Sequence, residues 1–398
     1  MKLLTIFLLI ALCFSIELIG QNLFDYEPEI IDGKAEALGQ ASILSSRGAN
    51  YLFNNTAMLS NLNKTNIQIN CRGITGTSNV YDTDKEHPFH FKLNAVSFCI
   101  PFNNNSSNKF ALGAGYRVYY DWSNNLKFEE RYLHYVNTFK KKTRGGLNTL
   151  VIGGAFNLSQ KFYGGLSLSL PVFSNLSYEE SEDGDLEYSS EGSVSGTFLT
   201  FSSAAILTRS LSAGFRLRTP FNLKEDWEST DITKSDNEIQ IPIELGFALK
   251  FSANDNINFY IEYISRNLSN YYILKYDPEE YPYDPEIQTD GKSDNGFSLR
   301  TGFEAGNKSE SFRFGLFLRS VPYYEYSKTD PSVIRKPKTE TGITLGGGGK
   351  SKSTMTFDMY GSLSFLMYES DQFDTRSSET DDFSYFRLRV GLTLGFEI

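Results

Sequence analysis

Apolar residues occupy every second position through much of this chain. The stretch from Phe386 to Ile398 shows the pattern clearly, because apolar side chains alternate with polar or small ones up to the last residue. A period of two predicts a β-strand with one apolar face. At the edge of a soluble sheet such a strand would promote aggregation, whereas a closed barrel has no edge. The stripe therefore favours a transmembrane β-barrel.

Similar stripes recur along the sequence. The strong stripes cover residues 166–172, 239–251, 257–263, 297–303, 312–318 and 355–367. Weaker stripes begin near Thr65, Phe91, Lys109, Asn148, Gly196, Arg209 and Lys338. With the terminal strand the total is about fourteen, an even number, as in single-chain bacterial barrels. The predicted fold class is all-β, an antiparallel transmembrane β-barrel of about 14 strands.

The connections between the predicted strands fall into two alternating groups. Six are short and lie at 103–108, 159–160, 208–210, 252–255, 307–309 and 349–352. Seven are long and lie near 78–89, 121–147, 173–195, 220–237, 266–294, 320–337 and 369–383. Outer-membrane barrels have short periplasmic turns and longer extracellular loops. A secreted all-β domain is the alternative, but it would not require this alternation.

The N-terminal part lacks the alternating pattern. Lys2 and the apolar run from Leu3 to Phe14 are typical of a secretory signal peptide, and the run is too short to cross a bilayer as a helix. Residues 22–62 are rich in small, helix-compatible residues, and such a segment fits inside a barrel; a periplasmic tail is the alternative. We predict a signal peptide over 1–20, a partly helical plug over 21–63 and the barrel over 64–398.

The second predicted strand contains a shift in the alternation. Phe91 and Leu93 begin one face, whereas Phe98 and Ile100 continue on the opposite face. An extra residue in one strand of a pair causes such a shift. The sequence therefore predicts a β-bulge near Ala95–Val96.

Composition and charge agree with a barrel. Aromatic residues make up 15% of the chain, which is typical of a barrel with aromatic girdles. The formal charge of −10 argues against nucleic acid as a partner. Cys71 and Cys99 are too few for a disulfide framework, and we expect outward-facing thiols in preference to a single bridge. The acidic loops lack the spacing of a calcium loop, so we expect solvated loops and no bound metal or cofactor.

Short motifs resemble those of a known family. Residues 33–42 are rich in Gly and Ala, and Asn55, Ala57 and Leu59 form an Asn-x-Ala-x-Leu pattern. The Gly/Ala-rich segment that starts at Gly33, followed by this pattern, resembles the N-terminal part of the FadL-type outer-membrane transporters of hydrophobic compounds. Family members usually have Asn-Pro-Ala-Gly-Leu at the position of the pattern. The segment Gly214–Phe221 also looks similar to a segment of family members.

The resemblance spans the mature chain, although Thr56 and Met58 replace the proline and the glycine of the motif. It implies a fourteen-stranded barrel whose N-terminal plug blocks the lumen. It also implies that long-chain fatty acids or other hydrophobic small molecules bind inside and leave by a side opening that a kinked strand forms. PorV-type secretion barrels look similar at this level and are the alternative.

The faces opposite the apolar stripes would line the lumen. Seven arginines point inward from these faces, namely Arg117, Arg216, Arg218, Arg300, Arg319, Arg387 and Arg389. The inward-facing carboxylates that can pair with some of them are those of Glu244, Glu262, Glu304 and Asp358. Arginines hold carboxylates through paired, charge-assisted hydrogen bonds. The arginines are therefore candidate ligand-binding residues for a carboxylate, or they form a space-filling network with the acidic side chains.

No pattern of residues supports catalysis. His87, His90 and His134 lie in or beside predicted loops, without partners at a spacing typical of a catalytic triad. We therefore expect a monomeric, non-enzymatic barrel in the outer membrane of a Gram-negative-type bacterium, in contact with outer-membrane lipid. Its expected function is passive transport of hydrophobic small molecules such as long-chain fatty acids. A secretion-apparatus or structural barrel is the alternative.

Overall fold

A computed structural model gives the architecture of the chain. It describes residues 31–80, 83–104, 108–121, 124–132, 135–182, 185–229, 235–267, 295–307, 309–321, 338–351, 354–370 and 381–398. The predicted signal peptide over 1–20 and the start of the predicted plug lie outside these residues. The helices of the described chain include none long and apolar enough to cross a membrane.

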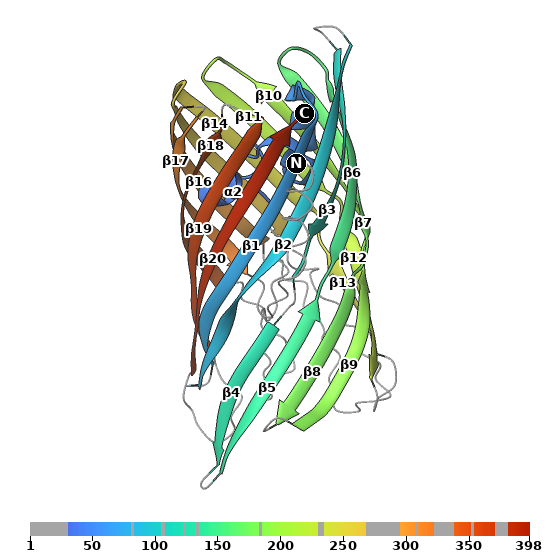
Figure 1. The fold of residues 1–398 in the computed structure, drawn as a ribbon, viewed down its shortest axis with the longest axis vertical. Helices are drawn as coiled ribbons and strands as arrows, with labels where there is room; N and C mark the ends of the chain where they lie inside the picture. Colours follow the sequence, from blue (N-terminus) through green and yellow to red (C-terminus); the bar gives the residue numbers. More distant parts are fainter. Residues whose placement is uncertain are drawn as a thin grey trace.

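The strands form one closed antiparallel barrel, which confirms the predicted fold class (Figure 1). Eight strands run without interruption: β1 (Asn66–Val80), β2 (Thr83–Asn104), β15 (Ile257–Asn267), β16 (Asn295–Gly306), β17 (Ser311–Val321), β18 (Lys338–Lys350), β19 (Met355–Ser370) and β20 (Asp381–Glu397). The C-terminal strand closes the barrel on the first, since β1 and β20 pair from Asn66 opposite Glu397 to Asn79 opposite Ser384.

Six further strands each consist of two segments, so the barrel has fourteen strands in all. The pairs of segments are β3 (Asn108–Val118) with β4 (Asn124–Tyr132), β5 (Tyr135–Gly145) with β6 (Asn148–Asn157), β7 (Phe162–Pro171) with β8 (Asn175–Glu182), β9 (Asp185–Ser195) with β10 (Phe198–Ile206), β11 (Leu211–Arg218) with β12 (Phe221–Ser229), and β13 (Ser235–Ile241) with β14 (Glu244–Asn254). They follow one another around the wall.

Glycine and proline explain most of these interruptions. Gly145–Gly146, Pro171, Gly196, Pro220 and Pro242 lie in or next to five of the six breaks. Proline cannot donate to a strand ladder, and glycine adopts backbone angles that strands do not use. Hydrogen bonds join neighbouring breaks, as from the Tyr119 amide to the Leu147 carbonyl (2.8 Å). The six breaks therefore form one continuous band in the wall.

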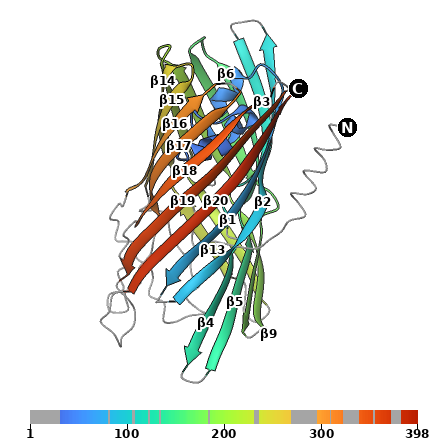
Figure 2. The same cartoon turned by 60° about the vertical axis from the view of Figure 1, so that its left-hand side comes forward.

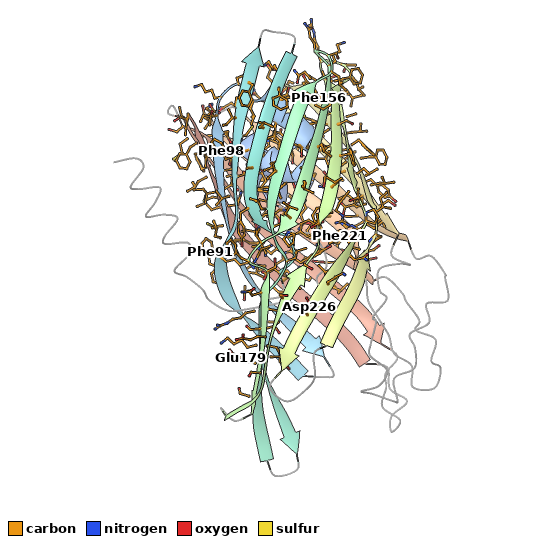
Figure 3. All side chains as sticks on the ribbon, turned by 90° about the vertical axis from the view of Figure 1, so that its right-hand side faces the viewer. Phe91, Phe98, Phe156, Glu179, Phe221 and Asp226 are labelled. Carbon is orange, nitrogen blue, oxygen red and sulfur yellow. The ribbon has the colours of Figure 1, made fainter. Side chains whose placement is uncertain are left out.

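Large apolar side chains cover the outside of the barrel. Phe247, Ile261 and Phe312 are each more than half exposed, and they lie on three different strands. Figure 3 shows Phe98 and Phe156 on the outer surface, in the half of the barrel that carries the short turns. A barrel presents such a belt to lipid. The predicted outward direction of the stripes is correct for most of their length.

The predicted connections were only partly correct. Short turns join the strands where the sequence predicted them, for example between β10 and β11 and between β14 and β15. Four predicted long loops, at 78–89, 121–147, 173–195 and 220–237, instead contain strand segments. β4, β5, β8 and β9 project beyond the other strands at the end away from the C-terminus (Figure 1). These segments lack an apolar stripe, which is why the sequence pattern missed them.

The predicted β-bulge is confirmed in β2. Asn70 lies opposite Ala95 and Cys71 lies opposite Leu93, so Asn94 is the extra residue. The bulge lies one residue before the predicted position.

Residues 31–62 lie inside the barrel in the half with the short turns (Figures 1 and 2). They contain two short α-helices, α2 (Gly33–Ala37) and α3 (Tyr51–Asn54), and two 3-10 helices, η1 (Gly48–Asn50) and η2 (Thr56–Asn61). α2 packs on β17 to β20, and η2 packs on β6, β7 and β10. Residues 31–62 therefore form a plug that touches opposite sides of the wall.

Glycines in the wall allow the plug to come close. A methyl group at Gly315 of β17 would overlap the backbone nitrogen of Gly39 in the plug. Gly39 has a φ of 67°, in the left-handed region that favours glycine. A methyl group at Gly302 of β16 would lie 2.6 Å from the Leu38 carbonyl oxygen. The inner wall thus carries a glycine lining shaped to the plug backbone.

A candidate ligand site above the plug

An apolar cluster lies inside the barrel at the band of strand breaks. It consists of Tyr119, Tyr120, Leu147, Leu176, Val194, Phe198, Phe221, Leu223 and Ile241. Each of these residues is within three positions of a break. The breaks turn side chains inward that an unbroken strand would direct elsewhere. In Figure 3, Phe221 lies near the middle of the barrel's length.

Tyr119 is the centre of this apolar cluster. Its ring lies 4.7 Å from Tyr120 and 4.7 Å from Phe198, measured between ring centroids. Phe198 stacks on Phe221 at 4.7 Å. Tyr119 follows β3, whereas Phe198 and Phe221 begin β10 and β12, which lie several strands further around the wall. The chain after β3 therefore turns into the lumen, away from the wall.

Two arginines border the aromatic rings. The guanidinium carbon of Arg117 lies 4.3 Å from the centre of the Tyr119 ring and 5.6 Å from that of Phe53 in the plug. The guanidinium of Arg218 lies 5.6 Å from the Phe221 ring and donates to the Tyr119 hydroxyl. Cations over aromatic faces are attracted by the ring quadrupole. The site therefore combines an apolar surface with positive charge.

Glu244 joins these arginines into one group, which we call the Glu244 cluster: Arg117, Arg216, Arg218, Arg266 and Glu244. The carboxylate lies 2.7 Å from Arg216, 3.6 Å from Arg218 and 2.7 Å from Arg266. Arg216 also donates to the carbonyl of Asn54 in the plug, at 3.5 Å. Three guanidiniums thus contact one carboxylate, and Arg117 lies beside them over the Tyr119 ring. The cluster is positively charged, and it touches the plug.

The remaining predicted arginines lie on β16, β17 and β20. Arg300 pairs with Glu262 at 3.0 Å, and Arg319 pairs with Glu340 at 2.5 Å. Arg387 and Arg389, from β20, are also buried in the lumen. The predicted arginines therefore form two groups, and Arg216, Arg218, Arg300 and Arg319 pair with carboxylates of the wall. The expected pairing with inward carboxylates is correct; ligand binding by the arginines stays a prediction.

The plug residues singled out by the sequence are all buried. The Gly33 amide donates to the Thr393 hydroxyl at 2.7 Å, and the Ala57 amide donates to the Ser202 hydroxyl at 3.0 Å. Asn55 donates to the Ser203 carbonyl at 3.2 Å. Leu59 packs in an apolar group with Leu52, Phe53 and wall residues of β2, β3 and β6. These residues hold the plug to the wall.

Sequence reasoning missed the aromatic part of the site. Ile241 was assigned to the same outward stripe as Ile243, but Ile241 is fully buried while Ile243 is 41% exposed. The break at Pro242 reverses the direction of the side chains between them. Pro220 does the same between Arg218 and Phe221, which both face inward. Pro220 and Pro242 are the features of the sequence that could have predicted these changes of direction.

The wall is incompletely paired next to Tyr119. β2 pairs with β3 as far as Ala95 opposite Arg117, and it meets β4 again at Glu86 opposite Lys127. Between these points the described residues show no ladder pairing of β2 with β3 or β4. Asp121, just after the inward turn, accepts from Arg72 at 3.3 Å and contacts Lys92. A charged contact therefore spans the place where the strand ladder stops.

Solved structures of similar architecture are known. A FadL homologue of Pseudomonas aeruginosa has a TM-score of 0.60 at 10% identity, and the match covers 92% of this chain and 98% of that one. The toluene transporter TodX of Pseudomonas putida has a TM-score of 0.58 at 11% identity, covering 95% and 100%. The toluene transporter TbuX of Ralstonia pickettii has a TM-score of 0.54 at 10% identity, covering 94% and 100%.

The chain has the fold of the FadL-type transporters. No protein-family model and no curated protein matches its sequence. The match covers the barrel and the plug together, so the resemblance inferred from the motifs of the N-terminal part holds for the fold.

Other candidate chemistry is sparse in this FadL-type barrel. The described residues contain no group of His, Cys, Asp and Glu arranged to hold a metal ion. His134 and the side chains of His87 and His90 lie outside the described part of the chain. Cys71 and Cys99 are both thiols, and Cys99 faces the plug instead of facing outward as expected. It contacts the apolar plug residues because β2 brings every second residue inward beside Ala95.

Proposed function

We propose that this protein is a passive outer-membrane transporter of hydrophobic small molecules, with long-chain fatty acids as the default ligand. It would act as a monomer surrounded by outer-membrane lipid of a Gram-negative-type bacterium, without enzymatic activity. A ligand would enter from the rim with the long loops, bind above the plug and leave past it. The alternative is a PorV-like secretion or structural barrel without small-molecule transport.

The apolar cluster beside the Glu244 cluster carries this proposal. A barrel that served only as a scaffold would need no aromatic surface in its lumen, because polar networks fill small barrels equally well. Here Tyr119, Phe198 and Phe221 lie next to Arg117 and Arg218. Ligand sites are commonly apolar with a few placed polar groups. This arrangement suits an apolar tail with an acidic end.

The related structures give further support. They are the structures of a FadL homologue and of two toluene transporters. The interrupted pairing of β2 with β3 and β4 offers a side exit, which the resemblance to the family also implies. We propose that the ligand leaves there after the contact of Asp121 with Arg72 and Lys92 opens.

The test is binding of labelled palmitate and labelled toluene to the folded chain in detergent. Replacing Phe221 by Ala should weaken binding of both compounds about tenfold, because apolar contact area in the site is lost. The matched control is Phe251→Ala, which removes an outward-facing ring that is 48% exposed and should leave binding unchanged.

A further variant addresses the class of ligand. Arg218→Gln should weaken palmitate binding more than toluene binding, because only palmitate carries a charge. Equal loss for both would argue for hydrocarbons as ligands. A folded, heat-modifiable barrel that binds neither compound would contradict the transport proposal and support the secretion or structural role.

A further inference from the structure

A buried carboxylate in the plug has no hydrogen-bond partner in the described structure. Glu36, in α2, is 1% exposed. Neither of its carboxylate oxygens meets a donor in hydrogen-bonding geometry among the described residues. An ionised group in this position carries a large desolvation cost unless opposite charges lie near. The free energy of burying an ionised Glu36 therefore depends on the charges around it.

Arginines of the wall supply those opposite charges. Burial raises the pKa of Glu36, whereas Arg389, Arg300 and Arg319 favour its charged form, as does the Gln40 amide to a lesser degree. Arg389 in turn lies within electrostatic range of Arg387. We call Glu36 with Arg300, Arg319, Arg387 and Arg389 the Glu36 cluster. It has no residue in common with the Glu244 cluster.

The arginines lie between α2 and the rim with the long loops. α2 and the following turn contact the wall at Thr393 of β20, Thr344 of β18 and Gly315 of β17. Arg389 precedes Thr393 on β20, which runs toward the short-turn rim. Arg319 follows Gly315 on β17, which runs the opposite way. A molecule arriving from the long-loop rim therefore meets the arginines before it meets α2.

The same cluster also holds the chain that follows α2. Arg300 donates to the Gln40 carbonyl at 3.2 Å and pairs with Glu262. Glu262 accepts from the amides of Ser42 and Ile43 at 2.7 and 2.6 Å. A new charge beside Arg300 would thus alter the hydrogen bonds that hold residues 40–43 of the plug to the wall.

We propose that the Glu36 cluster is an anion-binding site whose resident counter-ion is Glu36, and that the anionic headgroup of an amphiphilic ligand displaces this carboxylate. The inference rests on the proposed transport function and adds how the ligand acts on the plug. Displacement leaves Glu36 without its counter-charges, so α2 loses attraction to β16, β17 and β20. Neutral hydrophobic compounds cannot do this, because they do not compete for guanidiniums.

The chemistry favours such an exchange. Arg300 and Arg319 have wall partners in Glu262 and Glu340. Glu36 lies within electrostatic range of Arg389, Arg300 and Arg319, but without a hydrogen bond from them. A ligand sulfonate or carboxylate that formed charge-assisted hydrogen bonds would bind these arginines more strongly than Glu36 does. Glu36 therefore competes only weakly with an anionic ligand for these arginines.

The experiment compares two probes of equal chain length, decane-1-sulfonate and decan-1-ol, on the folded full chain in a neutral detergent. Glu36→Gln should raise the affinity for the sulfonate about tenfold, because the competitor is removed. The affinity for the alcohol should not change. Hydrogen exchange of the α2 amides should increase when the sulfonate binds the unmodified chain, and this increase should be absent in Glu36→Gln.

Glu304→Gln is the matched control. Glu304 holds the same helix through Lys34 at 3.0 Å, and it also pairs with Arg313, which lies outside the Glu36 cluster. This variant should loosen α2 without changing the ratio of sulfonate to alcohol affinity. Arg389→Gln is a second variant and should lower the affinity for the sulfonate alone.

The outcomes separate the two proposals. An unchanged affinity ratio in Glu36→Gln and in Arg389→Gln, with the alcohol still bound, would overturn the displacement mechanism and leave the transport function standing. A folded barrel that binds neither probe would overturn the transport function, and the displacement mechanism with it.

Discussion

Charged side chains inside this barrel are held in small groups in which opposite charges touch. Glu244 contacts three arginines, and Arg313 contacts both Glu304 and Asp358 at 3.0 and 2.6 Å. Breaking such a buried group leaves charges without compensation, which costs far more than losing an exposed pair. The lumen is therefore sensitive to single substitutions that leave the outer belt unaffected.

Glu244→Gln tests this at the residue scale. We expect the free energy of unfolding to fall by about 3–5 kcal/mol, because Arg216, Arg218 and Arg266 lose their common carboxylate. Urea unfolding of the barrel in lipid vesicles measures the change. Glu397→Gln breaks the more exposed pair with Lys350 and should cost less than about 1 kcal/mol. Equal effects of the two substitutions would contradict the proposed stabilising role of the Glu244 cluster.

At the scale of elements, the strands serve two purposes. Their membrane-facing parts follow the period of two, while the six breaks direct Tyr119, Phe221 and Ile241 inward. The plug elements fit against the wall because glycines replace side chains where the backbones approach. Gly315 and Gly302 receive the Leu38–Gly39 turn. The shape of the lumen is therefore set by irregular positions in otherwise regular strands.

Gly315→Ala should displace the plug and leave the barrel folded. A β-carbon at Gly315 would overlap the Gly39 backbone, which cannot move aside without carrying α2 with it. We expect faster tryptic cleavage after Lys34 and Arg47 with unchanged heat modifiability on a gel. Gly361→Ala is the control, since a β-carbon there meets no atom within 4 Å. If cleavage is equally slow in both variants, the glycine lining does not position the plug.

For the whole molecule, the plug divides the lumen. Apolar contacts join it to β2, β3 and β6, and polar contacts join it to β15, β16 and β18. On the side of the long loops it meets the Glu244 cluster, whose residues lie on β3, β11, β14 and β15, and the arginines of the Glu36 cluster, which lie on β16, β17 and β20. A ligand that entered the barrel would therefore find two separate groups of arginines, of which the first adjoins the rings of Tyr119, Phe198 and Phe221.

Deleting residues 31–62 should turn the closed barrel into an open pore. The plug lies in the half of the barrel with the short turns, and the inner wall behind it carries polar side chains such as Ser202 and Glu262 that water can solvate. Ion conductance in planar bilayers should rise steeply relative to the intact chain. Unchanged conductance in a folded deletion variant would mean that other parts of the chain also close the lumen.

The sequence alone determined the strand number, the closure of the barrel, the inward arginines and the internal plug. These features depend on local geometry: alternate residues of a strand face opposite sides, and a long segment without alternation has no place in the wall. The tertiary structure decided the rest. Ile241 and Phe221 face inward only because strand breaks rotate them, and the partners of Arg216 and Glu36 come from distant parts of the chain. Such contacts depend on how strands and plug are placed against one another, which a periodic pattern does not encode.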